Sequence, residues 1–114
     1  MQFKEIGNPE GKTLVLLPGT ACTWQINYKN VIRELAQTYH LICVNYDGFE
    51  GDASVMFTDM ITVTKKIERY IIKHHNGAVD GIYGSSLGGS FVGLLIQRGK
   101  IHMDHGFSGS SDLD

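Results

Sequence analysis

One serine of this sequence stands in a setting that suits covalent chemistry, because a glycine lies two positions away on either side. The segment from Gly84 to Gly88 has the pattern G-x-S-x-G with Ser86 at its centre, where an apolar stretch meets a helical pattern. On a strained strand-to-helix turn a nucleophilic serine points its hydroxyl outward, and the small residues let strand and helix approach closely. The next residue, Leu87, would offer its backbone N–H to a developing oxyanion. The alternative is a packing turn rich in glycine and serine that performs no chemistry.

Such a turn needs a buried strand before it and a helix after it, and the surrounding sequence predicts both. Short, apolar, β-branched segments that end in turn residues are typical of buried parallel strands. Four segments are of this kind: Thr13–Leu17, His40–Tyr46, Val79–Tyr83 and approximately Met103–Ser108. Apolar residues at three- and four-residue steps predict helices in three segments: Trp24–Gln37, Val55–Lys73 and Leu87–Arg98, the last of which ends at Gly99.

The order of these elements predicts the fold class. Strands that alternate with helices form an α/β fold, with a mostly parallel sheet, right-handed crossovers and flanking helices. Gln2–Ile6 precedes a turn-forming stretch, residues 7–11, and predicts a short antiparallel strand at one edge of the sheet.

Length, composition and charge limit the classes of protein to which the chain can belong. With 114 residues, 42% of them hydrophobic, residues 1–114 form one domain around one core. Ten Lys and Arg against twelve Asp and Glu argue against nucleic acid or an anionic membrane as a partner. No apolar run approaches the roughly 20 residues of a membrane span, and residues 1–6 lack the pattern of a signal peptide. We therefore expect a cytoplasmic protein in which Cys22 and Cys43 are buried free thiols.

The residues upstream of the serine, taken together with it, resemble the α/β-hydrolase family. In that family the strand before the first helix ends in a loop that donates a second oxyanion N–H, and residues 16–20, LLPGT, occupy this place. Thr20 is the matching donor. Pro18 replaces a histidine that the family often has, which need not matter because the donor is a backbone group, and Trp24 matches a tryptophan of many relatives.

A second loop extends the resemblance, which covers roughly residues 13 to 109. Residues 44–52 look like a variant of the family's Asp-x-x-Gly-x-Gly loop, with Asn45 in the place of the Asp and one extra residue. The resemblance implies a serine hydrolase that acts on an ester, thioester or related acyl bond. Ser86 would attack the carbonyl, and the N–H groups of Leu87 and Thr20 would hold the oxyanion.

The same resemblance implies that part of the catalytic triad is missing. In this family the acid and then the histidine follow the serine, and only 28 residues follow Ser86. His102 and His105 come too early, and we expect structural roles for them. Asp112 is the candidate acid, ahead of Asp114, although most relatives place this residue one strand later. The domain therefore matches the N-terminal portion of a hydrolase, truncated after the sixth-strand region and inactive alone because serine needs an adjacent base.

Two alternatives follow from this incompleteness. In the first alternative, the chain is a non-catalytic fragment or ligand-binding module that keeps the fold without the activity. Alternatively, two copies associate through the sheet edge that lacks its usual neighbour. The expected partner of an active protein is a small-molecule acyl substrate, whose identity the sequence does not indicate.

The sequence predicts neither a cofactor nor a metal. His74 and His75 are neighbours at a helix end and point in different directions, which indicates a solvated helix end. The spacing of the acidic residues 47, 50 and 52 matches no known calcium loop, and the glycine-rich stretch 84–89 matches no nucleotide-binding pattern. Three aromatic residues could line a cleft but are more typical of packing groups: Trp24, Phe49 and Tyr83.

Overall fold

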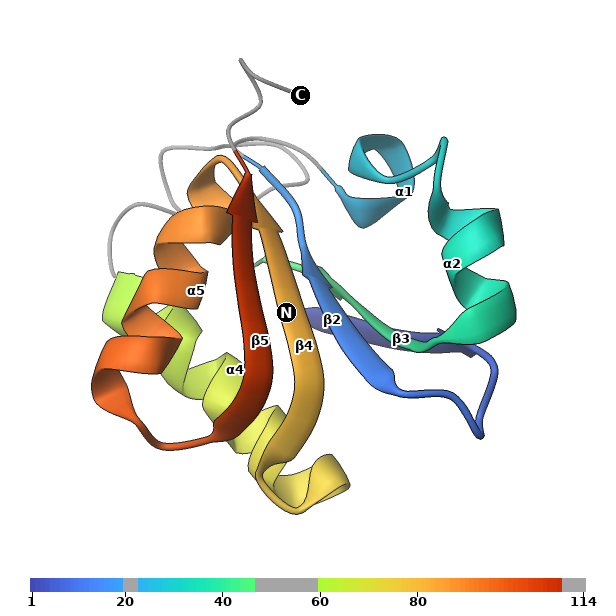
Figure 1. Ribbon diagram of the computed structural model, residues 1–114. Coiled ribbons are helices and arrows are strands. Elements are labelled where there is room, and N and C mark those ends of the chain that lie inside the picture. Colours follow the sequence, from blue (N-terminus) through green and yellow to red (C-terminus); the bar gives the residue numbers. More distant parts are fainter. Residues whose placement is uncertain (20–22, 47–59, 110–114) are drawn as a thin grey trace.

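The computed structural model describes residues 1–19, 23–46 and 60–109, which form one β-sheet with helices on both faces (Figure 1). Every predicted strand is present, within one or two residues at each end. The five strands are β1 (Gln2–Gly7), β2 (Thr13–Leu17), β3 (His40–Asn45), β4 (Ala78–Ser85) and β5 (His102–Gly109). The helices are α1 (Trp24–Asn27), α2 (Ile32–Thr38), α4 (Met60–His75) and α5 (Leu87–Arg98). The predicted α/β class is confirmed.

The strands follow the order β1-β3-β2-β4-β5 across the sheet. β1 pairs with β3 in antiparallel fashion, as the sequence predicts, and the other three pairings are parallel. β2 and β4 are therefore neighbours at the centre, and their carboxyl ends meet at the same end of the sheet. This arrangement brings the loop after β2 next to the turn that follows β4.

The larger part of the core lies between the sheet and the helices α4 and α5. The buried residues of this part include Val15, Ile42 and Ile82 from the sheet, Ile67 from α4 and Phe91 from α5. The other face carries α1 and α2 over a smaller buried cluster that is made of Leu16, Tyr28, Leu41 and Cys43. Cys43 is a buried free thiol, as the sequence predicts, and burial raises the pKa of this thiol to about 12. Cys22 lies outside the described residues.

One predicted helix, Trp24–Gln37, is wrong as a single element. The structure divides it into α1 and α2, and the chain between them turns at Tyr28. Tyr28 is buried, and its hydroxyl bonds to the carbonyl oxygen of Leu17, which fixes the chain at this point. The helical spacing of apolar residues continues through this turn: Val31 and Ile32 follow Tyr28 by three and four residues, although the helix is interrupted there. Periodicity alone does not reveal such a break.

The two other predicted helices agree with the structure where it describes them. The described part of α4 runs from Met60 to His75, two residues beyond the predicted end, and the predicted residues 55–59 lie outside the described part. α5 has the predicted bounds and ends at Gly99, whose φ of +61° is the left-handed conformation that glycine adopts freely. Among the helices described, none combines the length and the apolar character needed to cross a membrane.

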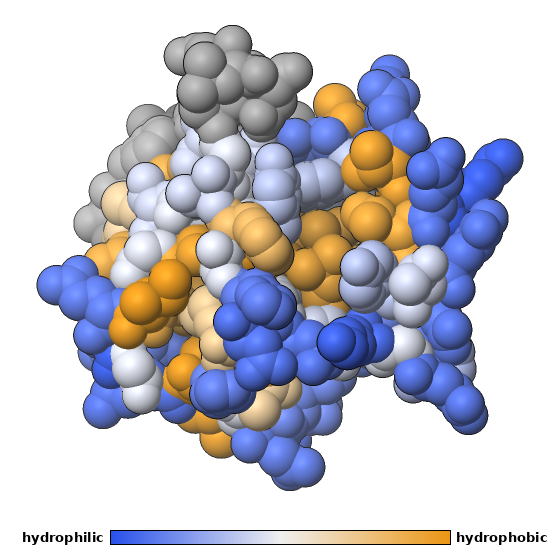
Figure 2. Space-filling model, viewed as in Figure 1, coloured by the Kyte–Doolittle hydropathy of each residue, from blue (hydrophilic) through white to orange (hydrophobic). Residues whose placement is uncertain are grey.

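A hydrophobic hollow opens on the face that α1 and α2 cover only in part (Figure 2). Its volume is about 1060 Å³, and its lining includes Leu14, Tyr28, Val31, Tyr83 and Phe107. β5, at the edge of the sheet, borders it with mostly exposed side chains, and Phe107 is 49% exposed. Of the aromatic residues that the sequence suggested for a cleft, Tyr83 therefore lines a groove.

Candidate active site

Ser86 occupies the junction between the end of β4 and the start of α5, as the sequence predicts. Its backbone has φ +53° and ψ −111°, and its side chain is exposed. In the described part of the chain only Asn76 and Ser86 have a positive φ without being glycine. This conformation costs free energy in a residue with a Cβ, and it persists where the surrounding structure imposes it. The strained turn that a nucleophilic serine requires is present.

The two glycines of the motif, Gly84 and Gly88, lie where the backbone leaves no room for a side chain. A Cβ on Gly84 would lie 2.1 Å from the carbonyl oxygen of Gly88, and a Cβ on Gly88 would lie 2.4 Å from that of Leu17. Both distances are shorter than any real contact, so a side chain at either position would push the helix away from the strands. The first turn of α5 therefore approaches β4 and β2 as closely as the motif implies.

The turn itself is held by β5. The Ser86 N–H donates to the carbonyl oxygen of Gly109 at 2.7 Å, and the Gly89 N–H donates to the carbonyl oxygen of Ser86 at 2.9 Å. The Ser86 side chain makes no capping hydrogen bond with α5, so the helix does not hold its hydroxyl. Leu87 begins this 12-residue helix. Its N–H therefore belongs to the positive end of the helix dipole.

The loop after β2 lies directly against this turn. A Cβ on Gly19 would lie 3.5 Å from the Cβ of Ser86, and the Gly19 N–H donates to Asn27 Oδ1 at 2.6 Å. Thr20, the predicted second oxyanion donor, follows immediately in the sequence but lies outside the described residues. The backbone that leads to Thr20 thus reaches the serine.

Two tyrosines that were not among the predicted site residues hold this loop. The Tyr28 hydroxyl donates to the carbonyl oxygen of Leu17 at 2.7 Å, and the Tyr46 hydroxyl donates to that of Pro18 at 2.9 Å. Burial, followed by the effect of Tyr28, raises the pKa of Tyr46 above its usual value, so Tyr46 stays a donor. The sequence contains a signal for such a role, because a tyrosine in an otherwise apolar buried segment needs a hydrogen-bond partner for its hydroxyl.

Asn45, at the end of β3, joins the first helix to the sheet. Its Oδ1 accepts the Trp24 N–H at 2.9 Å, and its Nδ2 donates to Gln25 Oε1 at 3.1 Å. An asparagine serves here because it offers both an acceptor and a donor, which a carboxylate does not. Trp24 packs against the smaller core cluster, in agreement with a packing role.

The histidines of the chain lie far from Ser86. His105 pairs with Gly81, which is four residues before Ser85 and so about 13 Å away along the strand. His102 starts β5 and bonds to Asp104 at 2.9 Å, in keeping with a structural role. The remaining three, His40, His74 and His75, lie at the start of β3 and the end of α4. These positions are at the amino ends of the parallel strands, opposite Ser86.

Several predicted polar or aromatic residues lie outside the described part of the chain. They are Asp47, Phe49, Glu50, Asp52, Asp112 and Asp114. The prediction that Asp112 is the acid therefore remains a prediction.

The predicted solvated end of the long helix is wrong for one residue. His74 is exposed, but His75 is half-buried and lies 3.1 Å from Glu5, which also bonds to His40. Glu5 belongs to the edge strand and His40 to the next strand. The sequence does not predict this group, because its three residues are far apart along the chain and no local pattern connects them.

Comparison with solved structures identifies the architecture. A structure of an α/β-hydrolase family protein from Desulfitobacterium hafniense superposes on 94% of this chain with a TM-score of 0.80 and 24% identity. The fold is that of an α/β-hydrolase, present in part. A carboxylesterase structure from Nitrososphaera gargenis matches with a TM-score of 0.73 and 18% identity over 94% of the chain. The structure of the type II thioesterase BorB from the borrelidin biosynthetic cluster matches 93% of the chain, with a TM-score of 0.72 and 16% identity.

The chain spans less than half the length of these α/β-hydrolase structures. It covers 43%, 40% and 45% of them respectively. No protein-family model matches the sequence, and a search of curated proteins gives no match either. The likeness therefore establishes the partial fold, which agrees with the fold class and the resemblance seen in the sequence.

Proposed function

We propose that this chain supplies the nucleophile and the oxyanion-binding backbone of a serine hydrolase that acts on an ester, thioester or related acyl bond. Ser86 Oγ attacks the acyl carbonyl, and the carbonyl oxygen takes up negative charge in the tetrahedral intermediate. The N–H groups of Leu87 and Thr20 bind this oxygen. A histidine from outside this chain accepts the serine proton and later returns it to the leaving group, while an acid orients that histidine. Water, activated by the same histidine, then attacks the acyl-serine, releases the acid product and restores Ser86.

The strained, exposed conformation of Ser86 is the observation that carries the proposal. A packing turn has no need to hold a serine at φ +53° with its hydroxyl free of the helix. The loop with Gly19 packs against the same residue, which supports a second oxyanion donor beside the first. Two structures of similar fold are named as a carboxylesterase and a thioesterase, which supports acyl chemistry.

The position of the histidines favours a second candidate, a ligand-binding module without catalysis. A serine without an adjacent base is a weak nucleophile, and no described histidine lies beside Ser86: His105 is about 13 Å away along the strand, and the others are at the opposite end of the sheet. The two candidates differ in one respect that can be measured. If the chain is part of a serine hydrolase, a base supplied from outside restores nucleophilic attack by Ser86. If it is a ligand-binding module, the added base has no such effect.

Hydrolysis with and without added imidazole tests the proposal. Imidazole takes the place of the absent histidine, and p-nitrophenyl butyrate and an acyl thioester serve as substrates. We expect imidazole-dependent turnover, above that of imidazole alone, which Ser86→Ala abolishes. Ser90→Ala is the matched control, because Ser90 is an exposed serine on the same helix, and it should keep the activity. Turnover that survives in Ser86→Ala would overturn the assignment, and binding of substrate without any turnover would favour the module.

The cellular location and the oligomeric state stay predictions from the sequence. A cytoplasmic location follows from the sequence pattern alone. Self-association through the sheet edge at β5 is supported by the exposure of its side chains and is tested below.

A further inference from the structure

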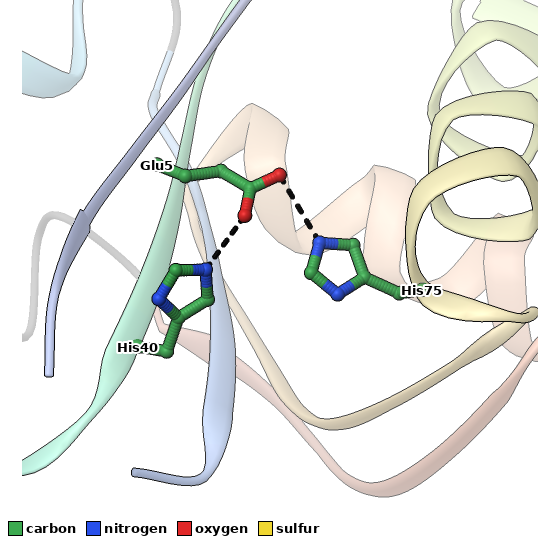
Figure 3. A group of neighbouring side chains, drawn as sticks. All are labelled: Glu5, His40 and His75. Carbon is green, nitrogen blue, oxygen red and sulfur yellow. Dashed lines mark hydrogen bonds and ion pairs between the residues drawn. The ribbon is translucent and has the colours of Figure 1, made fainter. Parts of the chain in front are cut away.

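Two imidazoles and one carboxylate meet at the end of the sheet opposite Ser86 (Figure 3). Glu5 comes from β1, His40 begins β3, and His75 ends α4. Glu5 Oε1 lies 2.6 Å from His40 Nε2, and Glu5 Oε2 lies 3.1 Å from His75 Nε2. The ligating atoms of the three residues all lie within 4.8 Å of one another. Figure 3 shows the carboxylate between the two rings, with one Nε2 directed at each oxygen.

We propose that Glu5, His40 and His75 bind one divalent ion of the zinc class. The donor set decides the class of metal, because two imidazole nitrogens and one carboxylate oxygen suit Zn²⁺. Ca²⁺ and Mg²⁺ prefer sets of oxygen ligands. Three protein ligands leave the fourth position of a tetrahedral ion to water.

The distances permit such an ion after small side-chain rotations. Zinc ligands at about 2.0–2.2 Å in tetrahedral geometry lie roughly 3.4 Å from one another. Each imidazole Nε2 is now closer than this to one Glu5 oxygen, His40 at 2.6 Å from Oε1 and His75 at 3.1 Å from Oε2, and no pair of ligating atoms is more than 4.8 Å apart. The side chains of Glu5, His40 and His75 are 27%, 21% and 17% exposed. The group is therefore partly shielded yet reachable by an ion from solution.

The carboxylate is already ionised and oriented for this role. Burial by itself would raise the pKa of Glu5, but hydrogen bonds from Tyr70, His40 and His75 outweigh it and lower the pKa to about 2. Burial, followed by the hydrogen bond to Glu5, raises the pKa of Tyr70, so its hydroxyl remains a donor. Tyr70 is in turn stacked on Phe3 with ring centroids 4.0 Å apart. Partners of this kind fix the orientation of metal-ligating groups.

One atom of the cluster limits the affinity. His40 Nδ1 is buried and has no hydrogen-bond partner among the described residues. An ion on Nε2 leaves the ring proton on Nδ1, where no acceptor meets it, and metal-binding histidines usually have such an acceptor. We therefore expect weaker binding than that of a structural zinc site with four protein ligands.

A bound ion would join three elements that are distant in sequence. It would tie the edge strand β1 to β3 and to the end of α4, 35 and 70 residues away from Glu5. Because the cluster lies at the opposite end of the sheet from Ser86, the proposal is independent of the proposed hydrolase function. Its expected effect is on stability.

Zinc titration of the metal-free chain tests this proposal. After treatment with a chelator and its removal, isothermal titration calorimetry with Zn²⁺ should give one site per chain. At a hundredfold excess of Zn²⁺ over the dissociation constant, the melting temperature should rise by about 10 °C. Mg²⁺ should give neither signal.

Neighbouring histidines provide a matched control. His75→Gln and His40→Gln should weaken Zn²⁺ binding at least about tenfold. His74→Gln should bind as the wild type does, because His74 is exposed at the same helix end and lies outside the cluster. Far-UV circular dichroism verifies that each variant is folded, and visible absorption of bound Co²⁺ gives a second readout of the ligand set. Absence of binding by the wild type, or wild-type affinity in a folded His75→Gln variant, would overturn the proposal.

Discussion

Replacing Gly88 by alanine tests the close approach of α5 to β2, on which the turn at Ser86 depends. A Cβ at Gly88 would lie 2.4 Å from the carbonyl oxygen of Leu17 and 3.0 Å from the Cβ of Leu17. The oxygen belongs to the backbone of a central strand, so it can withdraw only if the strand or the helix moves. Gly93 is the matched control on the same helix, because a Cβ there meets no atom within 4 Å.

The magnitude follows from two opposing contributions. Both substitutions gain about 1 kcal/mol, because glycine is less favourable than alanine in a helix by about that amount. Gly88→Ala also strains the packing, at a cost of about 3 kcal/mol, near the upper end for overpacked sites because the obstacle is backbone. We therefore expect Gly88→Ala to lower the free energy of unfolding by about 2 kcal/mol and Gly93→Ala to raise it by about 1 kcal/mol.

Urea denaturation followed by circular dichroism measures both free energies under one set of conditions. The gap of about 3 kcal/mol corresponds to about 12 °C in melting temperature for a domain of this size. Equal stability of the two variants would refute the close approach of α5 to β2. Gly88→Ala should also reduce any chemistry at Ser86, because the first turn of the helix moves.

Other perturbations probe the strain at the serine, the buried hydroxyls, the charge of the edge strand and the open sheet edge. Ser86→Gly should be more stable than Ser86→Ala by about 1 kcal/mol, because glycine adopts φ +53° without strain; equal urea midpoints would contradict this. Tyr46→Phe removes the hydroxyl that donates to the buried carbonyl of Pro18 and should cost about 1–2 kcal/mol in the same assay, whereas an unchanged midpoint would show that the bond adds nothing. The pKa of Glu5 is lowered from 4.5 to about 2, so the stability that its carboxylate contributes is complete above pH 4.5 and is lost as the pH falls toward 2. The wild type should therefore lose stability relative to Glu5→Gln over this range, and parallel pH profiles would disprove it. Sedimentation velocity should show self-association that increases with concentration, and a monomer at all concentrations would exclude it.

The strands and the turn at Ser86 could be predicted because their signals are local. Thr13–Leu17 and Leu87–Arg98 have the predicted bounds, since apolar runs and helical periodicity end there in turn residues. The G-x-S-x-G spacing likewise reports a close backbone approach within five residues. The break at Tyr28 could not be read in this way. It depends on a hydrogen bond to Leu17, which lies on another element.

The cluster at Glu5 shows what local signals omit. Glu5 and His40 meet because His40 pairs with Gly7 in the antiparallel register, which makes Glu5 its diagonal neighbour on the same face of the sheet. His75 joins them because α4 ends beside the start of β3. The sequence predicts the edge strand but not its register, and a shift of one residue would turn Glu5 to the opposite face.

Covalent labelling shows directly whether Ser86 is a nucleophile. The chain is exposed to a fluorophosphonate probe in the presence of imidazole, and its intact mass is measured, with Ser86→Ala and Ser90→Ala treated alike. We expect a single adduct on the wild type and on Ser90→Ala, formed faster with imidazole, and none on Ser86→Ala. An adduct that persists in Ser86→Ala, or no adduct on the folded wild type at any imidazole concentration, would contradict the assignment of Ser86 as the nucleophile.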